Sequence, residues 1–194
     1  FAGPGGNGTA IGGLTGGACG VINIDAASID TDDVGPGGGA QTYNNEVLLS
    51  DDVVLTAAGA GDITFASGAT VDAATSAGEE TLELAGGGGN VVTNEALGAT
   101  TALGRVIASG AEIRLGGDVN TDNAGAGDGS QTYNDAVILT SDVGLSATGG
   151  DLVMASEVDG DGNGPWALDI SVLEGGAFEA QAPMGDQTPL GALF

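Results

Sequence analysis

The residues best suited to chemistry are acidic and amide side chains that alternate with glycine near the end of the chain. Residues 159–164 read Asp-Gly-Asp-Gly-Asn-Gly. Oxygen-bearing side chains at alternate positions converge on a hard cation in the first half of an EF-hand loop. The bidentate acid expected at the twelfth position is absent, because Ile170 stands there. One interpretation is a Ca²⁺ site at Asp159, Asp161 and Asn163, and the other is a polar turn that needs Asp and Asn for its backbone conformation.

Two more acidic clusters stand at equivalent positions of a repeat that is described below. Their oxygen atoms could hold cations between successive coils. The alternative is that they are solvated turn residues. The first cluster is Asp30, Asp32 and Asp33, and the second is Asp118, Asn120 and Asp122.

Three aromatic residues are candidates for a binding surface. Tyr43 and Tyr133 could present rings to sugars, or each could cap the start of a strand with its ring packed and its hydroxyl in water. Trp166 lies in a loop that only the second copy of the repeat contains. An exposed tryptophan there is a plausible contact residue, and the other interpretation is that it covers the edge of a coil.

The charge of the chain excludes several functions. It has 27 acids, two arginines, no lysine and no histidine, which gives a net charge of −25. Nothing can neutralise phosphates, so nucleic acid is not a partner, and anionic membrane surfaces are disfavoured. No apolar run is long enough for a transmembrane helix. Without His or Lys, and with Cys19 as the one cysteine, a nucleophilic triad cannot be assembled, and we expect no enzyme.

A long internal repeat organises the chain. Gln-Thr-Tyr-Asn occurs at 41–44 and again at 131–134. The apolar pairs that follow each copy match at offsets of 90 to 86, and the slips fall in Gly- and Asp-rich segments. Turns therefore vary while strands persist. The repeat units are roughly 1–30 (partial), 31–120 and 121–194 (nearly complete).

The apolar residues within each repeat predict short β-strands. They come as i, i+2 pairs such as Val53/Leu55 and Leu82/Leu84, and a period of two is typical of a strand with one buried face. The 39 glycines separate the strands, together with Asn, Asp and Ser. No apolar stripe has the period of a helix, so the chain is predicted to be all-β.

Two architectures fit short strands in a long repeat. The first is a right-handed parallel β-helix, a β-solenoid, with three or four coils per repeat and residues 1–194 as one continuous unit. The second is a pair of tandem Ig-like β-sandwiches, because about 100 residues per domain is also the right size. Short strands and frequent glycine favour the solenoid.

The order of motifs resembles the repeats of large bacterial filamentous-haemagglutinin-like exoproteins and adhesins. The first copy runs from Gly39-Ala40-Gln41-Thr42-Tyr43-Asn44 to Thr101-Ala102-Leu103-Gly104, and the second runs from Gly129-Ser130-Gln131-Thr132-Tyr133-Asn134 to Thr188-Pro189-Leu190-Gly191. The resemblance implies a right-handed β-helix, secretion to the cell surface, and an adhesive or scaffolding role without catalytic residues. The extreme acidity and the lack of lysine depart from the family, so no receptor is carried over.

Two functions are compatible with these features. The first is an extracellular or cell-surface filament or rod, built by end-to-end stacking of copies of this chain or of further turns of the same chain. The uncharged stretches 1–14 and 187–194 favour it. The second is an adhesin segment that binds glycan or protein through the loop at 159–166. Ca²⁺ is the one cofactor that the sequence suggests.

Overall fold

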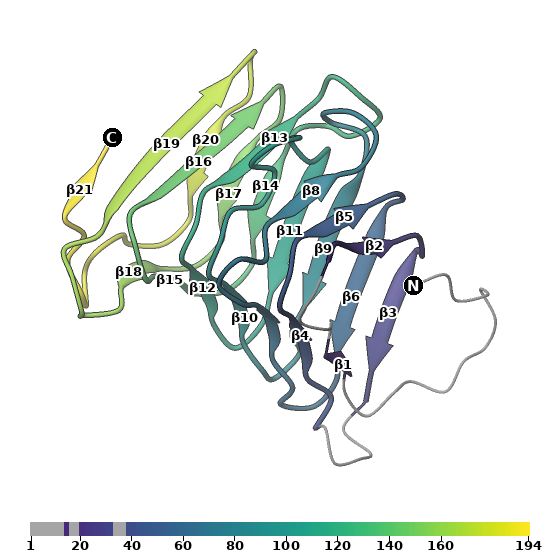
Figure 1. The fold of residues 1–194 in the computed structure, drawn as a ribbon. Helices are drawn as coiled ribbons and strands as arrows, with labels where there is room; N and C mark the ends of the chain where they lie inside the picture. Colours follow the sequence, from purple (N-terminus) through teal and green to yellow (C-terminus); the bar gives the residue numbers. More distant parts are fainter. Residues whose placement is uncertain (1–13, 16–19, 33–37) are drawn as a thin grey trace.

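The chain forms a rod of stacked turns. The computed structural model describes residues 14–15, 20–32 and 38–194, so the expectations for Cys19, Asp33 and residues 1–13 lie outside the described residues. The described part is all-β, has no helix, and builds a β-solenoid of about 7 turns. Figure 1 shows the first turns at one end of the rod and the last turns at the opposite end.

The strands form three faces of the rod, and each face is a parallel sheet. The first face contains β3 (Ser28–Thr31), β6 (Val53–Ala57), β9 (Thr81–Ala85), β11 (Arg105–Ser109), β14 (Gln131–Tyr133), β17 (Leu152–Met154) and β20 (Phe178–Ala180). The second contains β1 (Leu14–Thr15), β4 (Gln41–Tyr43), β7 (Ile63–Phe65), β10 (Val91–Thr93), β12 (Ile113–Leu115), β15 (Val137–Leu139) and β18 (Val158–Gly160). The third contains β2 (Ile22–Ile24), β5 (Val47–Leu49) and β8 (Val71–Ala73), then β13 (Val119–Asp122), β16 (Val143–Thr148), β19 (Ala167–Leu173) and β21 (Ala192–Leu193).

The two halves of the third face are joined by single bridges. Leu97 pairs in parallel with Val71 on one side and with Val119 on the other. The chain therefore visits the third, first and second faces in the same order in every turn. Every strand pair in the described residues is parallel. This pairing confirms the solenoid and sets the antiparallel sandwich alternative aside.

The core runs along the axis of the rod as ladders of aliphatic side chains. Strands such as β5 and β15 alternate buried, half-buried and buried residues, as the i, i+2 pairs predict. Val53 and Leu55 on the first face are at most 1% exposed, whereas Glu83 on the same face points outward and is exposed. The interior of each turn is thin, and aliphatic side chains fill it. In the described residues one pair of aromatic rings stacks, Tyr43 on Phe65, with 4.9 Å between the ring centroids.

Glycine lets successive turns approach closely at a corner of the rod. Gly39, Gly61, Gly89 and Gly110 follow one another up the stack. A Cβ on Gly61 would overlap the backbone of Gly39, and one on Gly89 would overlap the carbonyl group of Gly61. A Cβ on Gly110 would lie 2.8 Å from the carbonyl oxygen of Gly89. Much of the glycine content therefore serves backbone contact between turns.

The sequence repeat and the structural turn do not coincide. Each strand of one copy corresponds to the strand ten labels later, as β4 does to β14 and β10 to β20. These ten strands and the bridge position at Leu97 occupy eleven successive face positions, which at three per turn make 3⅔ turns. Gln41 therefore lies on the second face and its counterpart Gln131 on the first. Successive copies are rotated by one third of a turn.

Candidate functional site

Carboxylates of strands β8 and β18 hold the backbone of the following turn. Oδ1 of Asp72 accepts hydrogen bonds from the amides of Thr100 and Thr101, at 2.7 and 3.0 Å. Its counterpart in the second copy is Asp159, which accepts them from the amides of residues 187 and 188, at 3.2 and 3.1 Å. Both carboxylates are buried, with 2% and 4% exposure. Charged acceptors make the stronger hydrogen bonds, so these acids are turn-to-turn clamps.

A similar arrangement recurs at residues that directly precede a strand. In each case a carboxylate oxygen accepts a backbone N–H from the next turn, 25 to 29 residues later. With Asp72 and Asp159, seven of the 27 acids have a structural use of this kind in the part of the chain that the structure describes. The pairs are Asp52 with Thr81, Asp62 with Asn90, Asp118 with Gly144, Asp142 with Ala167, and Asp151 with Ala177.

Asp159 belongs to one close group of carboxylates. Oxygens of Glu157, Asp159 and Asp186 lie within 4.8 Å of one another. Three carboxylates are hard oxygen donors of the kind that Ca²⁺ prefers. Asp159 already accepts two amide hydrogen bonds, and Gln187 Nε2 donates to Glu157 at 2.8 Å. The fit to a cation is therefore partial. Of the residues that the sequence predicted to bind Ca²⁺, Asp159 alone belongs to this group, and the sequence analysis did not point to Glu157 or Asp186.

Asp161 and Asn163 instead form a small turn with Trp166. Oδ1 of Asp161 accepts hydrogen bonds from the Asn163 amide at 2.9 Å and from the Trp166 indole at 2.7 Å. The indole bond, followed by the bonds from Asn163, holds the pKa of Asp161 below its usual value. Trp166 is half-buried, packs against the core, and lies over Gly164. Its N–H group is thus satisfied within the loop.

This loop has a counterpart in the first copy that sequence comparison did not reveal. Thr75 Oγ1 donates to Glu80 Oε1 at 2.6 Å, with the same spacing of five residues as the contact from Trp166 to Asp161. Glu80 is buried, and its Oε2 has no hydrogen-bond partner. Glu80 and Trp166 both directly precede a strand, β9 and β19 respectively. The two copies therefore place different chemistry on the same corner.

The two other predicted acidic clusters lie along strands. Asp30 accepts a hydrogen bond from Ser28 Oγ, and Asp32 directly follows β3. Asp118 accepts the Gly144 amide from the next turn, and Asp122 accepts the Ala124 amide within its own loop. Neither cluster is among the groups of three close acids in the part of the chain that the structure describes.

The Gln-Thr-Tyr motif builds a buried polar network, which the sequence alone did not predict. Gln131 Nε2 donates to the carbonyl oxygens of Val119 and Ser146, at 3.0 and 2.8 Å. Tyr133 donates its hydroxyl to Gln131 Oε1 at 2.9 Å. The first copy repeats the network with Tyr43, and both tyrosines are 1% exposed. Their rings are packed, as one of the two interpretations predicted. The rest of that interpretation was wrong, because each tyrosine ends its strand, β4 or β14, and donates its hydroxyl to a buried glutamine instead of to water.

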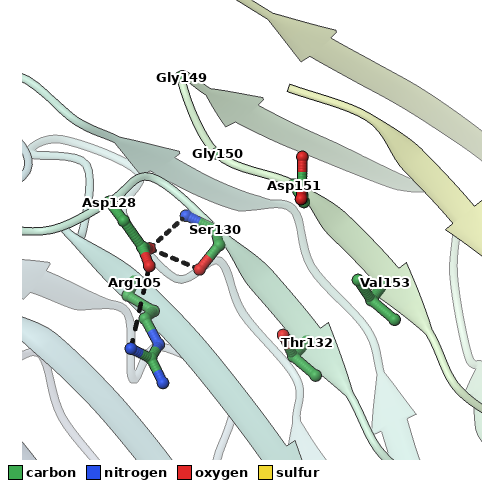
Figure 2. Close-up of a pocket in the computed structure, with 8 residues that line it drawn as sticks. All are labelled: Arg105, Asp128, Ser130, Thr132, Gly149, Gly150, Asp151 and Val153. Atoms are coloured by element: carbon green, nitrogen blue, oxygen red, sulfur yellow. Dashed lines mark hydrogen bonds and ion pairs between the residues drawn. The ribbon is translucent and has the colours of Figure 1, made fainter. Parts of the chain in front are cut away.

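A shallow groove of about 460 Å³ crosses the outside of the first face. Figure 2 shows Arg105 beside Asp128, with Thr132 and Val153 on the neighbouring strands. The Arg105–Asp128 ion pair is long, at 3.9 Å, and exposed. Burial raises the pKa of Asp128, but the hydrogen bonds from Ser130 and the positive charge of Arg105 act together against it, and the pKa stays below its usual value. The polar side chains that line the groove are Arg105, Asp128, Ser130, Thr132 and Asp151.

The last turn is the largest departure from a closed core. Phe178 is 40% exposed, whereas its counterpart Val91 is 0% exposed. Leu193 is 54% exposed, whereas its counterpart Val106 is 1% exposed. Inside the rod the next turn covers these positions. The last turn therefore leaves apolar side chains and a parallel strand edge uncovered.

The fold places the chain among β-solenoid proteins, compatible with β-helix repeat proteins. No protein-family model matches the chain, and neither a curated protein nor a solved structure matches it. No helix in the described residues is long and apolar enough to cross a membrane.

Proposed function

We propose that this chain is a structural building block of an extracellular or cell-surface filament, which elongates by stacking solenoid turns end to end. The observation that carries the proposal is the last turn. Phe178 and Leu193 are exposed there, although their counterparts inside the rod are fully buried. An apolar surface with an unpaired strand edge recruits another strand layer. A contact between two different surfaces of one molecule propagates into a fibre.

The resemblance to filamentous-haemagglutinin-like exoproteins agrees with this proposal, since it implies a secreted scaffolding rod. The acidic sides of the rod favour end contacts over lateral ones. With a net charge of −25, the sides of two rods repel each other, whereas the last residues, 187–194, carry no charged side chain.

Electron microscopy of the concentrated protein tests the proposal. We expect uniform fibres one solenoid wide for the native chain, and short particles for Phe178→Asp and Leu193→Asp. Thr132→Asp is the matched control, because it adds the same charge on the side of the rod. Fibres that persist in both end variants would remove the basis of the proposal.

The alternative function is an adhesin segment that binds glycan or protein. The observation in its favour is that Trp166 occupies the corner where the first copy has Glu80, so one corner differs chemically from its repeat equivalent. Under this alternative Trp166→Ala abolishes binding to immobilised glycans or cells, whereas Tyr133→Phe, which changes a buried side chain, leaves binding intact.

A further inference from the structure

We infer that the last turn is covered by the first turn of a second copy of this chain, rotated about the rod axis by one third of a turn. The inference rests on the proposed filament and adds the register of its contact. It follows from the rotation between sequence repeats, because the contacts inside one chain provide a template for the contact between chains.

The template for the first half of the contact is the pairing of β10 with β12. Val91, Val92 and Thr93 pair with Ile113, Arg114 and Leu115. The counterpart of β10 is β20 in the last turn, and the counterpart of β12 is β2 in the first turn. The same register then pairs Phe178–Ala180 of one copy with Ile22–Ile24 of the next. Because β20 lies on the first face and β2 on the third, the second copy is rotated by one face.

The template for the second half is the pair of bridges beside β13. Leu97 pairs with Val119, and Leu103 pairs with Thr121. The corresponding residues at the two ends are Met184 and Leu190 in the last turn, and Ile29 and Thr31 in β3. The contact therefore continues from β2 into β3 without a change of register.

Burial at the first turn is compatible with this assignment. Ile22 and Ile29 are half-buried, whereas their counterparts Ile113 and Val119 are 0% exposed. In the described residues, the first turn thus leaves partly exposed the positions that are fully buried inside the rod, on the opposite side of the stack from the last turn. Two surfaces that meet inside the repeat are each left partly open at the ends.

Charge discriminates between the rotated and the unrotated stack. In the unrotated stack β20 meets β3 of the same face, and matching their inward residues sets Glu179 directly opposite Asp30. Both side chains are exposed acids, and like charges directly opposite each other destabilise a strand pair. In the rotated stack Glu179 meets Asn23, which is uncharged. The rotation therefore avoids a repulsion in a chain that is already highly acidic.

The rotated contact also assigns a place to β21. Its counterpart β11 pairs with β14, through Val106 and Gln131. By the same register Leu193 pairs with Gln41 of the next copy, a place that Leu14 of the two-residue strand β1 holds within each chain. Formation of the filament thus exchanges β1 for β21 of the preceding copy.

Each added copy advances the filament by two repeats, or 7⅓ turns. With about 4.8 Å between stacked strands, this is a rise of about 35 Å per copy and about 105 Å per full rotation of three copies. A helical reconstruction from electron micrographs should show this rotation.

Disulfide trapping tests the register directly. In a Cys19→Ser background, one variant carries Glu179→Cys with Asn23→Cys, and the matched control carries Glu179→Cys with Asp30→Cys. Neighbouring parallel strands place the Cα atoms about 4.8 Å apart, within the range for a disulfide. Positions 23 and 179 lie at opposite ends of one chain (Figure 1), so a disulfide between them links two copies. We expect covalent oligomers from the first variant and monomers from the control on non-reducing gels.

The outcomes separate this inference from the filament itself. Filaments whose control variant cross-links, or in which neither pair cross-links, overturn the rotated register and leave the filament standing. Absence of both filaments and cross-links refutes the filament, and the register with it. Cross-linking of Glu179→Cys with Asn23→Cys alone supports both.

Discussion

Replacing Gln131 with methionine tests whether the repeated polar network holds the corner of the rod together. Methionine has a similar length but no hydrogen-bonding amide. The carbonyl oxygens of Val119 and Ser146 and the hydroxyl of Tyr133 each lose a contact of 2.8 to 3.0 Å. A buried polar group left unpaired costs about 1–3 kcal/mol. We therefore expect the free energy of unfolding to fall by about 3 kcal/mol or more.

A double-mutant cycle with Tyr133→Phe separates the network from simple packing. Phenylalanine removes the hydroxyl that Gln131→Met would leave unpaired, so the methionine substitution should cost about 1 kcal/mol less in that background. Urea unfolding followed by circular dichroism measures all four proteins, and Gln181→Met at an exposed position is the control. If Gln131→Met costs no more than the control, or if the cycle shows no coupling, the network does not stabilise the corner.

Four other predictions address the turns, the acids and the tyrosines. Gly89→Ala should lower the free energy of unfolding by about 1–3 kcal/mol, because the added Cβ would overlap the backbone of Gly61. Gly160→Ala is the control and should change thermal stability little, since the atom nearest to its added Cβ is 3.6 Å away. Equal melting temperatures for the two variants would refute the argument that the turns approach closely at Gly89. Asp72→Ala removes two amide hydrogen bonds and should cost about 1.5–3 kcal/mol or more in thermal unfolding, and an unchanged melting temperature would contradict the clamp. Burial raises the pKa of Tyr43 and Tyr133 well above 10. The unfolded chain therefore loses its phenolic protons at lower pH than the folded chain, and the free energy of unfolding should fall above pH 10 by up to about 2.7 kcal/mol per pH unit for the two tyrosines together. Tyrosinate absorbance that appears before the loss of circular dichroism would contradict this prediction. Ca²⁺ should raise the melting temperature and Asp186→Asn should remove that effect, and a calorimetric titration without heat would show that the calcium prediction is wrong.

The strands and their stacking were predictable from the sequence because they depend on local alternation. Pairs such as Val53/Leu55 indicate which face of a strand is buried, and in a thin parallel coil that face can be buried only in the interior of the coil. The same alternation placed Glu83 and Arg114 outside. The sequence predicted the approximate number of residues per turn but not the exact number, because the turns differ in length by several residues. Gln131 pairs with Leu152, 21 residues on, whereas Val53 pairs with Leu82, 29 residues on.

The roles of the polar residues were not predictable, because they depend on contacts between turns. Asp159 reads as part of a calcium-like loop with Asp161, but it lies in β18 and faces the next turn. Gln131 reads as an ordinary strand-start residue, yet it is fully buried. Its partners lie 12 and 15 residues away in sequence. No local pattern signals such pairs. The one clue in the sequence was that Gln-Thr-Tyr occurs in both copies. An exposed glutamine would have no physical reason to recur together with a tyrosine, so the recurrence indicates that the two side chains share a structural role.

The mismatch between repeat and turn shows which unit the sequence specifies. If the three faces differed in geometry, a segment moved from one face to another would misfold, and the repeat would need a whole number of turns. Instead Gln41 on the second face and Gln131 on the first make the same hydrogen bonds. The unit is therefore one strand with its corner, and each such unit needs only the strand below it and the strand above it. A rod built this way can be extended at its end from any face, so the phase of a second copy is set by side-chain complementarity between the first and last turns.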